Sequence, residues 1–392
     1  MSELDSLVDL GRYAFRGQEA ADVPDLTALT ADSKRELRMV GVDVDAEAER
    51  AGTFLQFDHS TVHCRSTRSG VEVLGIRQAL KKYNGLPEYF WKAIDPDTNA
   101  LSQAAAREDL HGGYFIRTER GAKIAEPVQT CLFIKGENVG QNIHNIVVVE
   151  EDSEVHIITG CATSHGVVSA LHLGISEFYI KKNGKLTFTM VHNWGEDVVV
   201  RPQTVGIVEQ GGVFQNNYVL LKKVKSVQSY PTIYLNGEGA VARFNSVLVT
   251  PTGSHVDTGN RIVLNAPHTR GEIISRAITT GGTMIARGEI IGNEVPARGH
   301  LECKGLILGG GLIHAIPELQ GTRPGVELSH EAAVGKIAQE EIEYLMARGL
   351  DEDEATSTIV RGFLNVEIMG LPDELRQSID ETITELNAHD AM

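Results

Sequence analysis

The sequence predicts a mainly β protein whose core is a right-handed β-helix (a solenoid), with a helical region before it and a helical bundle after it. From about Gly112 onward, short β-rich segments follow one another, each bounded by glycine or asparagine and almost free of internal proline. More than a dozen such segments continue for about 200 residues without a helix, which favours a solenoid over a sandwich or barrel. No strict repeat period is visible.

The chain divides into three expected regions. Residues 1–111 form an N-terminal mixed or helical domain, because charged runs such as ADSKRELRMV and IRQALKKYNGLPEYFWKAI have a helical character. Residues 112–328 form the β-helix core, and residues 329–392 form a C-terminal helical domain. Because the end turns of a solenoid would expose their core, we expect the two flanking regions to act as caps.

The C-terminal domain is expected to begin with a helix just after His330. Ile337, Ile342 and Leu345 fall near helical spacing, and Gly349 is a plausible glycine at the position after the helix end.

A second helix is expected to start at the acidic run DEDE, where Asp351 and Glu354 have the spacing of a capping box. A third begins at Leu371-Pro372, because proline suits the first turn of a helix. The three helices together predict a small bundle.

Composition and charge narrow the function classes. The chain has 53 acidic and 36 basic residues and a formal net charge of -17, which disfavours binding to nucleic acid. The N-terminus lacks the features of a signal peptide, and no run of about 18 apolar residues occurs, so we expect a cytoplasmic protein with no membrane partner.

Four cysteines are present: Cys64, Cys131, Cys161 and Cys303. They are far apart and none forms a CxxC pair, which argues against a local zinc knuckle or a ferredoxin-type loop. A disulfide framework is also unexpected at this chain length. Cys131 lies in an apolar strand and is expected to pack, and the His63-Cys64 pair is expected to be incidental.

Cys303 lies in HLECKGLIL, which alternates like a strand, and His330 and Glu331 are expected at the start of the following helix. Thiolate, imidazole and carboxylate groups bind iron or zinc well, so these three residues are candidate metal ligands. The alternative is that Cys303 is a buried hydrophobic residue and that Glu331 only favours the positive end of a helix.

The segment LSHEAAVGKIAQEEIEYLMARGLDEDEATSTIVRGF, residues 328–363, together with the preceding Cys303, resembles the SufB/SufD family of iron–sulfur cluster assembly scaffolds. The resemblance covers most of the chain from about Gly112. It implies a scaffold, itself no enzyme, on which an iron–sulfur cluster is bound transiently by Cys303, Glu331 and His330.

The resemblance also assigns roles elsewhere. Cys161, in VHIITGCATSHG, matches a cysteine that accepts sulfur, and His156 and His165 are close to it in sequence. MVHNWGEDVVVRP, which contains His192, Asn193, Trp194 and Arg201, resembles a stretch that lines a path between the two cysteines. Here the chain has His192 where glutamine is common.

One chain offers too few donors for a cluster, so we expect a homodimer, or a pair with a SufD-like paralogue, that shares the site. There is no GxxxxGK[ST] motif, and ATP is expected only through a SufC-like ABC ATPase. The resemblance implies docking on the Ile337 to Phe363 hairpin, with Tyr344, Ile359 and Phe363 as contacts. A sulfur donor and apo iron–sulfur proteins complete the expected partners.

Two other functions fit the same sequence. A β-helix carbohydrate-active enzyme would present acid and base carboxylates on one exposed face, although aromatic residues for sugar stacking are few. A metal-free interaction protein would use its helices to bind a partner. Anaerobic reconstitution with iron and sulfide separates these functions from that of a scaffold.

Overall fold

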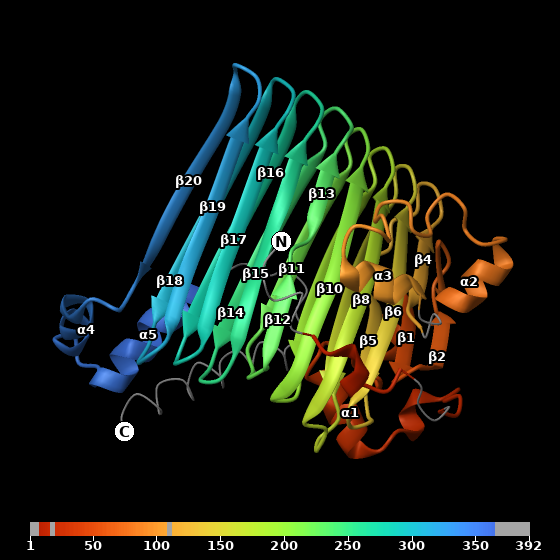
Figure 1. Ribbon diagram of the computed structural model, residues 1–392, viewed down its shortest axis with the longest axis horizontal. Coiled ribbons are helices and arrows are strands. Elements are labelled where there is room, and N and C mark those ends of the chain that lie inside the picture. Colours follow the sequence, from red (N-terminus) through yellow and green to blue (C-terminus); the bar gives the residue numbers. More distant parts are fainter. Residues whose placement is uncertain (1–7, 16–19, 108–111, 365–392) are drawn as a thin grey trace.

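The computed structural model describes residues 8–15, 20–107 and 112–364, which form a long β-solenoid with short helices at both ends (Figure 1). Two ten-stranded sheets form its opposite walls. Sheet A contains β3 (Val71–Gly75), β4 (Tyr114–Thr118), β6 (Val139–Val149), β8 (Ser169–Ile180), β10 (Asp197–Val208), β12 (Ser226–Ser229), β13 (Thr232–Leu235), β15 (His255–Leu264), β17 (Thr283–Gly292) and β19 (Leu312–Gly321). Sheet B contains β1 (Gly52–Phe57), β2 (Ser60–Ser66), β5 (Val128–Ile134), β7 (Glu154–Thr163), β9 (Lys185–Asn193), β11 (Val213–Leu220), β14 (Val241–Thr250), β16 (Thr269–Thr279), β18 (Ala297–Ile307) and β20 (Val326–Gly335).

Successive strands cross from one sheet to the other, so each coil of the solenoid adds one parallel strand to each wall. Register partners on neighbouring coils are therefore far apart in sequence: Cys161 pairs with His192, and Ser275 pairs with Cys303. The predicted solenoid is confirmed, and its coil of about thirty residues explains why no short repeat is visible in the sequence.

The interior of the solenoid, called the lumen below, is filled by alternate residues of every strand. β17, for example, alternates between half-buried and buried positions along its whole length. In parallel strands, residues in register point to the same face, so each lumen position stacks on its equivalents in the coils above and below. Between the two sheets, the Phe178 ring of sheet A contacts those of Phe188 and Phe214 of sheet B, and Phe214 contacts Phe244, with ring centroids 4.9, 5.6 and 5.8 Å apart.

The N-terminal region is less helical than expected. Its described residues contain α1 (Ala31–Arg38), α2 (Ile76–Lys82), α3 (Ala100–Arg107) and three short 3-10 helices (Leu10–Arg12, Leu26–Ala28, Glu47–Glu49), but also the strands β1, β2 and β3. The run from Ile76 to Ile94 is helical only in α2; Asn84, Leu86 and Trp91 have positive φ angles, which end a regular helix. The apolar residues of this run instead pack on the outer face of sheet A.

The C-terminal helices begin later than expected. α4 covers Gln339–Met346 and α5 covers Glu352–Leu364. Gly349 has a φ of 107°, as expected after a helix end. Asp351 and Glu354 form the predicted capping box, with N–H to carboxylate distances of 3.0 and 2.8 Å. The third helix expected from Leu371 lies outside the described residues.

Val360 and Leu364 of α5 pack on the outer face of sheet B, against Leu306 and Leu308. None of the described helices combines the length and the apolar content needed to cross a membrane.

Candidate functional site

Cys303 lies on β18 with its side chain in the lumen. Along this strand Leu301, Cys303 and Gly305 are buried, whereas Glu302 and Lys304 between them are half-buried and face outward. The thiol side chain is 2% exposed, and burial raises its pKa to about 11. In the structure of a single chain, Cys303 is therefore a protonated thiol at neutral pH.

The expected helix start at His330 and Glu331 is wrong, because both residues lie on β20. Although HEAAVG has good helix-forming residues, β20 pairs with β18 over ten residues, and this ladder outweighs local propensity. β20 is the last strand of sheet B, so its other edge has no partner among the described strands.

The register between β18 and β20 decides which of the three candidate ligands lie on the same face of sheet B. His330 pairs with Leu301 and therefore lies on the lumen side of β20, diagonally next to Cys303, where it is exposed at the end of the solenoid. Glu331 pairs with Glu302 and therefore points to the outer face. The structure thus brings Cys303 and His330 to one side of the sheet and leaves Glu331 on the other, and no three potential ligands form a metal-binding group within the described part of the chain.

Glu331 belongs instead to a row of charges outside the solenoid. The Lys304 Nζ atom lies 3.3 Å from a Glu331 carboxylate oxygen and 3.2 Å from a Glu302 carboxylate oxygen, and Arg276 also pairs with Glu302. Burial opposes ionisation of Glu302, but Lys304 and Arg276 outweigh this effect and lower its pKa. Two cations therefore lie near Cys303, but on the opposite face of sheet B. Lys304 is the next residue in the chain, and Arg276 lies one coil away.

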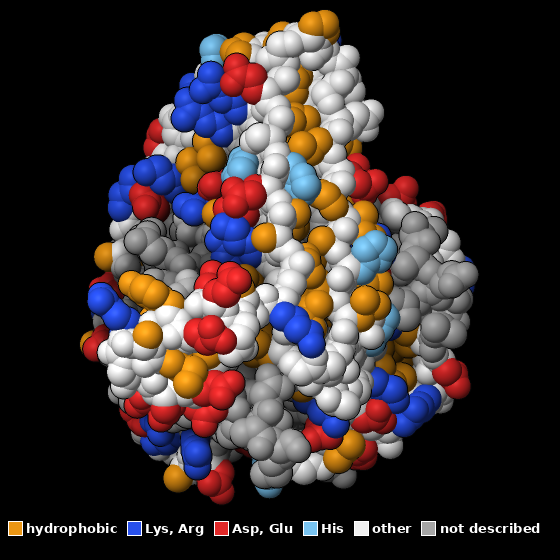
Figure 2. All heavy atoms as spheres, turned by 90° about the vertical axis from the view of Figure 1, so that its left-hand side faces the viewer, with side chains coloured by type: hydrophobic (Ala, Val, Ile, Leu, Met, Phe, Trp, Pro, Cys, Tyr) orange, Lys and Arg blue, Asp and Glu red, His pale blue; other side chains and the backbone are white. Residues whose placement is uncertain are grey.

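The coil that carries β19 and β20 ends the solenoid, and Figure 2 looks onto this end of the molecule. Hydrophobic and histidine side chains lie along the middle of this face, with charged groups on its flanks (Figure 2). Leu312, Leu319 and Val334 are 56%, 38% and 42% exposed here. Such an apolar surface beside two unpaired strand edges is suited to contact with another molecule.

Cys303 continues a mostly polar column of lumen residues. The members of this column follow one another in strict register from one coil to the next: Thr130, Thr159, Met190, Tyr218, Ser246, Ser275 and Cys303. The columns on either side are richer in large apolar groups such as Phe188 and Leu248. A line of hydroxyl groups through an otherwise apolar core is thus directed at the Cys303 thiol.

Cys161 lies on β7 in the neighbouring lumen column, two residues beyond Thr159, and is fully buried, which raises its pKa far above the ordinary value. His192, its register partner, also faces the lumen. The His192 Nδ1 atom is 2.9 Å from the Tyr218 hydroxyl oxygen, so His192 connects the position of Cys161 with the polar column. His156 and His165 do not flank Cys161: His156 contacts Thr189 on the outer face, and His165 is exposed in the following turn.

Trp194 packs between two lumen histidines, with ring centroids 5.0 Å from His172 and 5.4 Å from His192. Arg201 faces the outside of sheet A, where it donates to the carbonyl and hydroxyl oxygens of Ser226, so it does not line the lumen. Asn193 borders an external groove beside α1. His172 and Tyr218 were missed by sequence reasoning, and only the coil length could have aligned them with Cys161.

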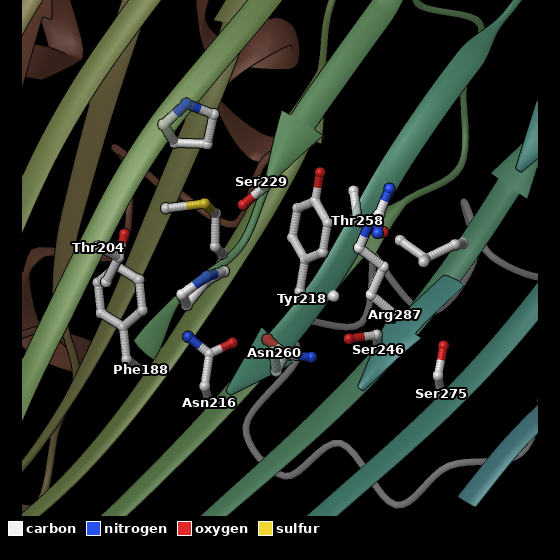
Figure 3. A pocket seen from close by; sticks show the side chains of 15 residues that line it. Phe188, Thr204, Asn216, Tyr218, Ser229, Ser246, Thr258, Asn260, Ser275 and Arg287 are labelled. Carbon is white, nitrogen blue, oxygen red and sulfur yellow. The ribbon is translucent and has the colours of Figure 1, made fainter. Parts of the chain in front are cut away.

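The polar column borders an internal cavity of about 30 Å³, room for about two water molecules. Figure 3 shows its lining side chains, which come from both sheets. Tyr218, Ser246 and Ser275 of the column belong to this lining. The cavity therefore lies between the two cysteines that the sequence singled out.

The other two cysteines lie elsewhere in the fold. Cys131 is fully buried in the apolar layer between sheet B and the N-terminal region. Cys64 is half-buried on β2, donates to the Val73 carbonyl oxygen at 3.4 Å, and has its pKa raised to about 12 by burial. Neither belongs to the polar column.

The expected partner-binding residues of the helical hairpin differ in exposure. Tyr344 of α4 is 61% exposed, whereas Ile359 is half-buried and Phe363 packs against sheet B. Tyr344 is thus available for an intermolecular contact, and Phe363 contributes mainly to holding α5 in place.

The sequence of this chain matches a known protein family. Residues 132–363 match the family described as "SUF system FeS cluster assembly, SufBD core domain". An iron–sulfur cluster assembly SufBD family protein of Archaeoglobus fulgidus is 52% identical over 89% of this chain and 94% of its own length. A SufBD family protein of Methanothermobacter thermautotrophicus strain Delta H is 46% identical over 94% of this chain and 91% of its own.

A more distant relative is the iron–sulfur cluster assembly protein SufB of Bacillus subtilis, which is 28% identical over 89% of this chain and 77% of its own length. The match to the core domain covers more than half of the chain and contains the strands from β6 to β20, Cys161 and Cys303, helix α4 and all but the last residue of α5. This chain therefore belongs to the SufBD family of the SUF system of iron–sulfur cluster assembly.

Proposed function

We propose that this protein is a scaffold subunit on which iron–sulfur clusters are built and from which they are transferred. The single observation that supports this role best is the position of Cys303, at the end of a polar lumen column and one strand away from the open edge of the solenoid. A nascent cluster needs thiolate ligands, and its release is easier when histidine or carboxylate groups complete the set.

The cluster is shared between two subunits in this proposal, because Cys303 and His330 of one chain supply only two ligands on one face. Glu331 lies on the edge strand, from which its side chain can reach around the edge toward a second molecule. Two copies related by a twofold axis would contribute Cys303, His330 and Glu331 twice. A SufD-like paralogue could take the place of the second copy.

Sulfur reaches the site from inside the solenoid. The Cys161 thiolate attacks the outer sulfur of the sulfur donor's persulfide, the donor's thiolate leaves, and Cys161 becomes the persulfide. The lumen column that begins beside His192 and Tyr218 leads toward Cys303. The lining hydroxyl groups can hydrogen-bond a polarisable sulfur species, while the surrounding apolar columns exclude bulk water.

Energy comes from a SufC-like ABC ATPase that docks on the α4–α5 hairpin, where Tyr344 offers exposed aromatic area. α5 is anchored to sheet B through Val360 and Leu364. A pull on the hairpin during dimerisation of two ATPase subunits would therefore be transmitted to β18 and β20. The movement would uncover Cys303, whose thiol is buried in the resting structure.

The test is anaerobic reconstitution of the protein with ferrous iron and sulfide. We expect the unmodified protein to gain visible charge-transfer absorption, and Cys303→Ser to lose most of its bound iron and sulfide. Cys131→Ser is the matched control, since Cys131 is equally buried but lies outside the polar column. Iron and sulfide contents and a spectrum of Cys303→Ser equal to those of the unmodified protein would refute Cys303 as a ligand, and no cluster absorption in any of the three proteins would refute the scaffold role.

A further inference from the structure

Two carboxylates, those of Glu302 and Glu331, lie side by side on the outer face of sheet B. The two residues are in register on the adjacent strands β18 and β20. Like charges directly opposite each other on neighbouring strands repel. Glu302 is the more enclosed of the two, with 15% of its side chain exposed against 59% for Glu331. Without a cation beside both groups, this repulsion would push the more exposed Glu331 carboxylate away from Glu302.

Lys304 of β18 is the cation that contacts both carboxylates. Its Nζ atom lies at nearly equal distances from them, 3.2 Å from an oxygen of Glu302 and 3.3 Å from an oxygen of Glu331. The residue of β20 in register with Lys304 is Ala333, whose methyl group cannot pair with the ammonium. Within the part of the chain that the structure describes, Lys304 is the one cation at ion-pair distance from Glu331.

The Lys304–Glu331 ion pair fixes the direction of the Glu331 side chain. Lys304 lies on the neighbouring coil, whereas the free edge of β20 lies on the other side of Glu331. The ion pair therefore turns the carboxylate toward the body of the solenoid and away from this edge. To bind iron beyond the edge, where a second subunit would complete the cluster site, the carboxylate has to leave Lys304.

The departure of Glu331 leaves no carboxylate or ammonium of this group unpaired. Lys304 keeps its contact with Glu302, and Glu302 also keeps its ion pair with Arg276. The exchange therefore costs only one exposed ion pair, which favours the paired state by at most about fivefold. An interaction of this size can be broken and formed again as a cluster binds and leaves.

We propose that Lys304 is a positioning residue that competes with iron for the Glu331 carboxylate. It holds Glu331 on the outer face in the metal-free protein, gives it up when a cluster is bound, and takes it back when the cluster is released. This inference rests on the proposed function in one respect, namely that Glu331 is a cluster ligand. It adds a residue that weakens cluster binding, which suits a scaffold that has to transfer its cluster.

The first test uses the metal-free protein. Carbodiimide and glycinamide label the protonated form of a carboxyl group, and peptide mass spectrometry measures the rate at Glu331. Lys304→Met should raise this rate about two- to fivefold, because the ammonium no longer favours the charged carboxylate. The matched control is Arg298→Met, which removes the ion pair with Glu327 between the same two strands. It should raise the rate at Glu327 and leave the rate at Glu331 unchanged.

The second test is an anaerobic titration with ferrous iron in the presence of sulfide. Lys304→Met should lower the iron concentration at half-maximal cluster absorption about two- to fivefold, since iron no longer competes with the ammonium. Lys304→Arg keeps the cation and should keep the midpoint of the unmodified protein, as should Arg298→Met. In the Glu331→Gln background, Lys304→Met should leave the midpoint unchanged, because no carboxylate remains to be released.

Each alternative has its own result. Equal labelling of Glu331 in the unmodified protein and in Lys304→Met would refute the hold on the carboxylate. Clusters that form in Lys304→Met and Arg298→Met with the same midpoint would refute the competition and leave the scaffold role intact. A midpoint that Lys304→Met lowers equally in the Glu331→Gln background would show an effect of charge alone, and would also refute it. No cluster absorption in any protein would refute the scaffold role and this inference with it.

Discussion

Cys303 and Glu331 lie on adjacent strands of sheet B, one register position apart, yet their side chains point to opposite faces of the sheet. A single chain cannot close a metal site with this pair. The proposed cluster site therefore requires either a second subunit or a movement of β20, and both possibilities have measurable consequences.

Glu331→Gln should lower the iron bound per dimer after reconstitution, because it removes a carboxylate that the shared site requires. The free energy of unfolding should change by less than about 1 kcal/mol, since the Lys304–Glu331 ion pair is exposed. Iron content and urea unfolding measure the two effects. Glu327→Gln is the control on the same strand, because Glu327 also forms an exposed ion pair, with Arg298. An equal loss of iron in both variants would argue against a specific role for Glu331.

Val334→Lys should weaken self-association, because it places a charge on the exposed apolar surface beside the β20 edge. Sedimentation velocity over a range of protein concentrations measures the shift from dimer to monomer. Val168→Lys is the control, since Val168 is also an exposed valine, 54% accessible, but lies in a turn far from this end. A dimer that resists the first substitution would place the subunit contact elsewhere.

Glu177→Gln should destabilise the protein by about 3 kcal/mol, because Glu177 is fully buried and its carboxylate is enclosed by donors. It accepts from the backbone N–H groups of residues 91–94 and lies 2.7 Å from the His144 Nε2 atom. Urea unfolding measures the loss. Glu272→Gln is the control, as its ion pair with Arg243 is exposed, and a similar loss there would contradict the explanation.

The same pair predicts weaker folding in acid. Burial lowers the pKa of His144, and the donors around Glu177 lower its pKa despite burial. Both groups therefore bind protons less readily in the folded protein. Their stabilising effect is complete above about pH 6.5, declines as His144 would be protonated in the unfolded chain, and declines further below about pH 4.3. Glu177→Gln should remove the further decline below about pH 4.3 and keep the decline due to His144, because Glu177 raises the pKa of His144 against the effect of burial. Unfolding curves measured from pH 7 to pH 3 separate the two parts.

Tyr344→Ala should reduce the affinity for a SufC-like ATPase by about tenfold or more, as expected for an exposed aromatic residue at the centre of an interface. Its melting temperature should stay the same, because the ring is not part of the packed core. Isothermal titration with the purified ATPase measures the affinity. Val360→Ala provides the contrast: it removes a buried contact of α5, so it should lower stability. Unchanged binding by Tyr344→Ala would move the docking surface away from α4.

Much of the fold could be predicted from the sequence because its signals are local. The alternation around Cys303, the glycine at Gly349 and the Asp351–Glu354 capping pair each depend on neighbouring residues, and each appears in the structure as predicted. The segment around His330 was predicted wrongly as a helix. Its own residues favour a helix, but the segment pairs with β18, and this pairing depends on residues far away in the sequence.

The sequence by itself determined that this chain forms a β-solenoid of the SufBD type, with four dispersed cysteines and an amphipathic helical hairpin. Only the tertiary structure decided that Cys303 and His330 lie on the same face of sheet B while Glu331 lies on the other, and that Tyr218, Ser246 and Ser275 line one column. Side-chain direction alternates along every strand, so a register between coils about thirty residues apart decides which groups meet. That register is set by the stacking of whole coils, which no short stretch of sequence encodes.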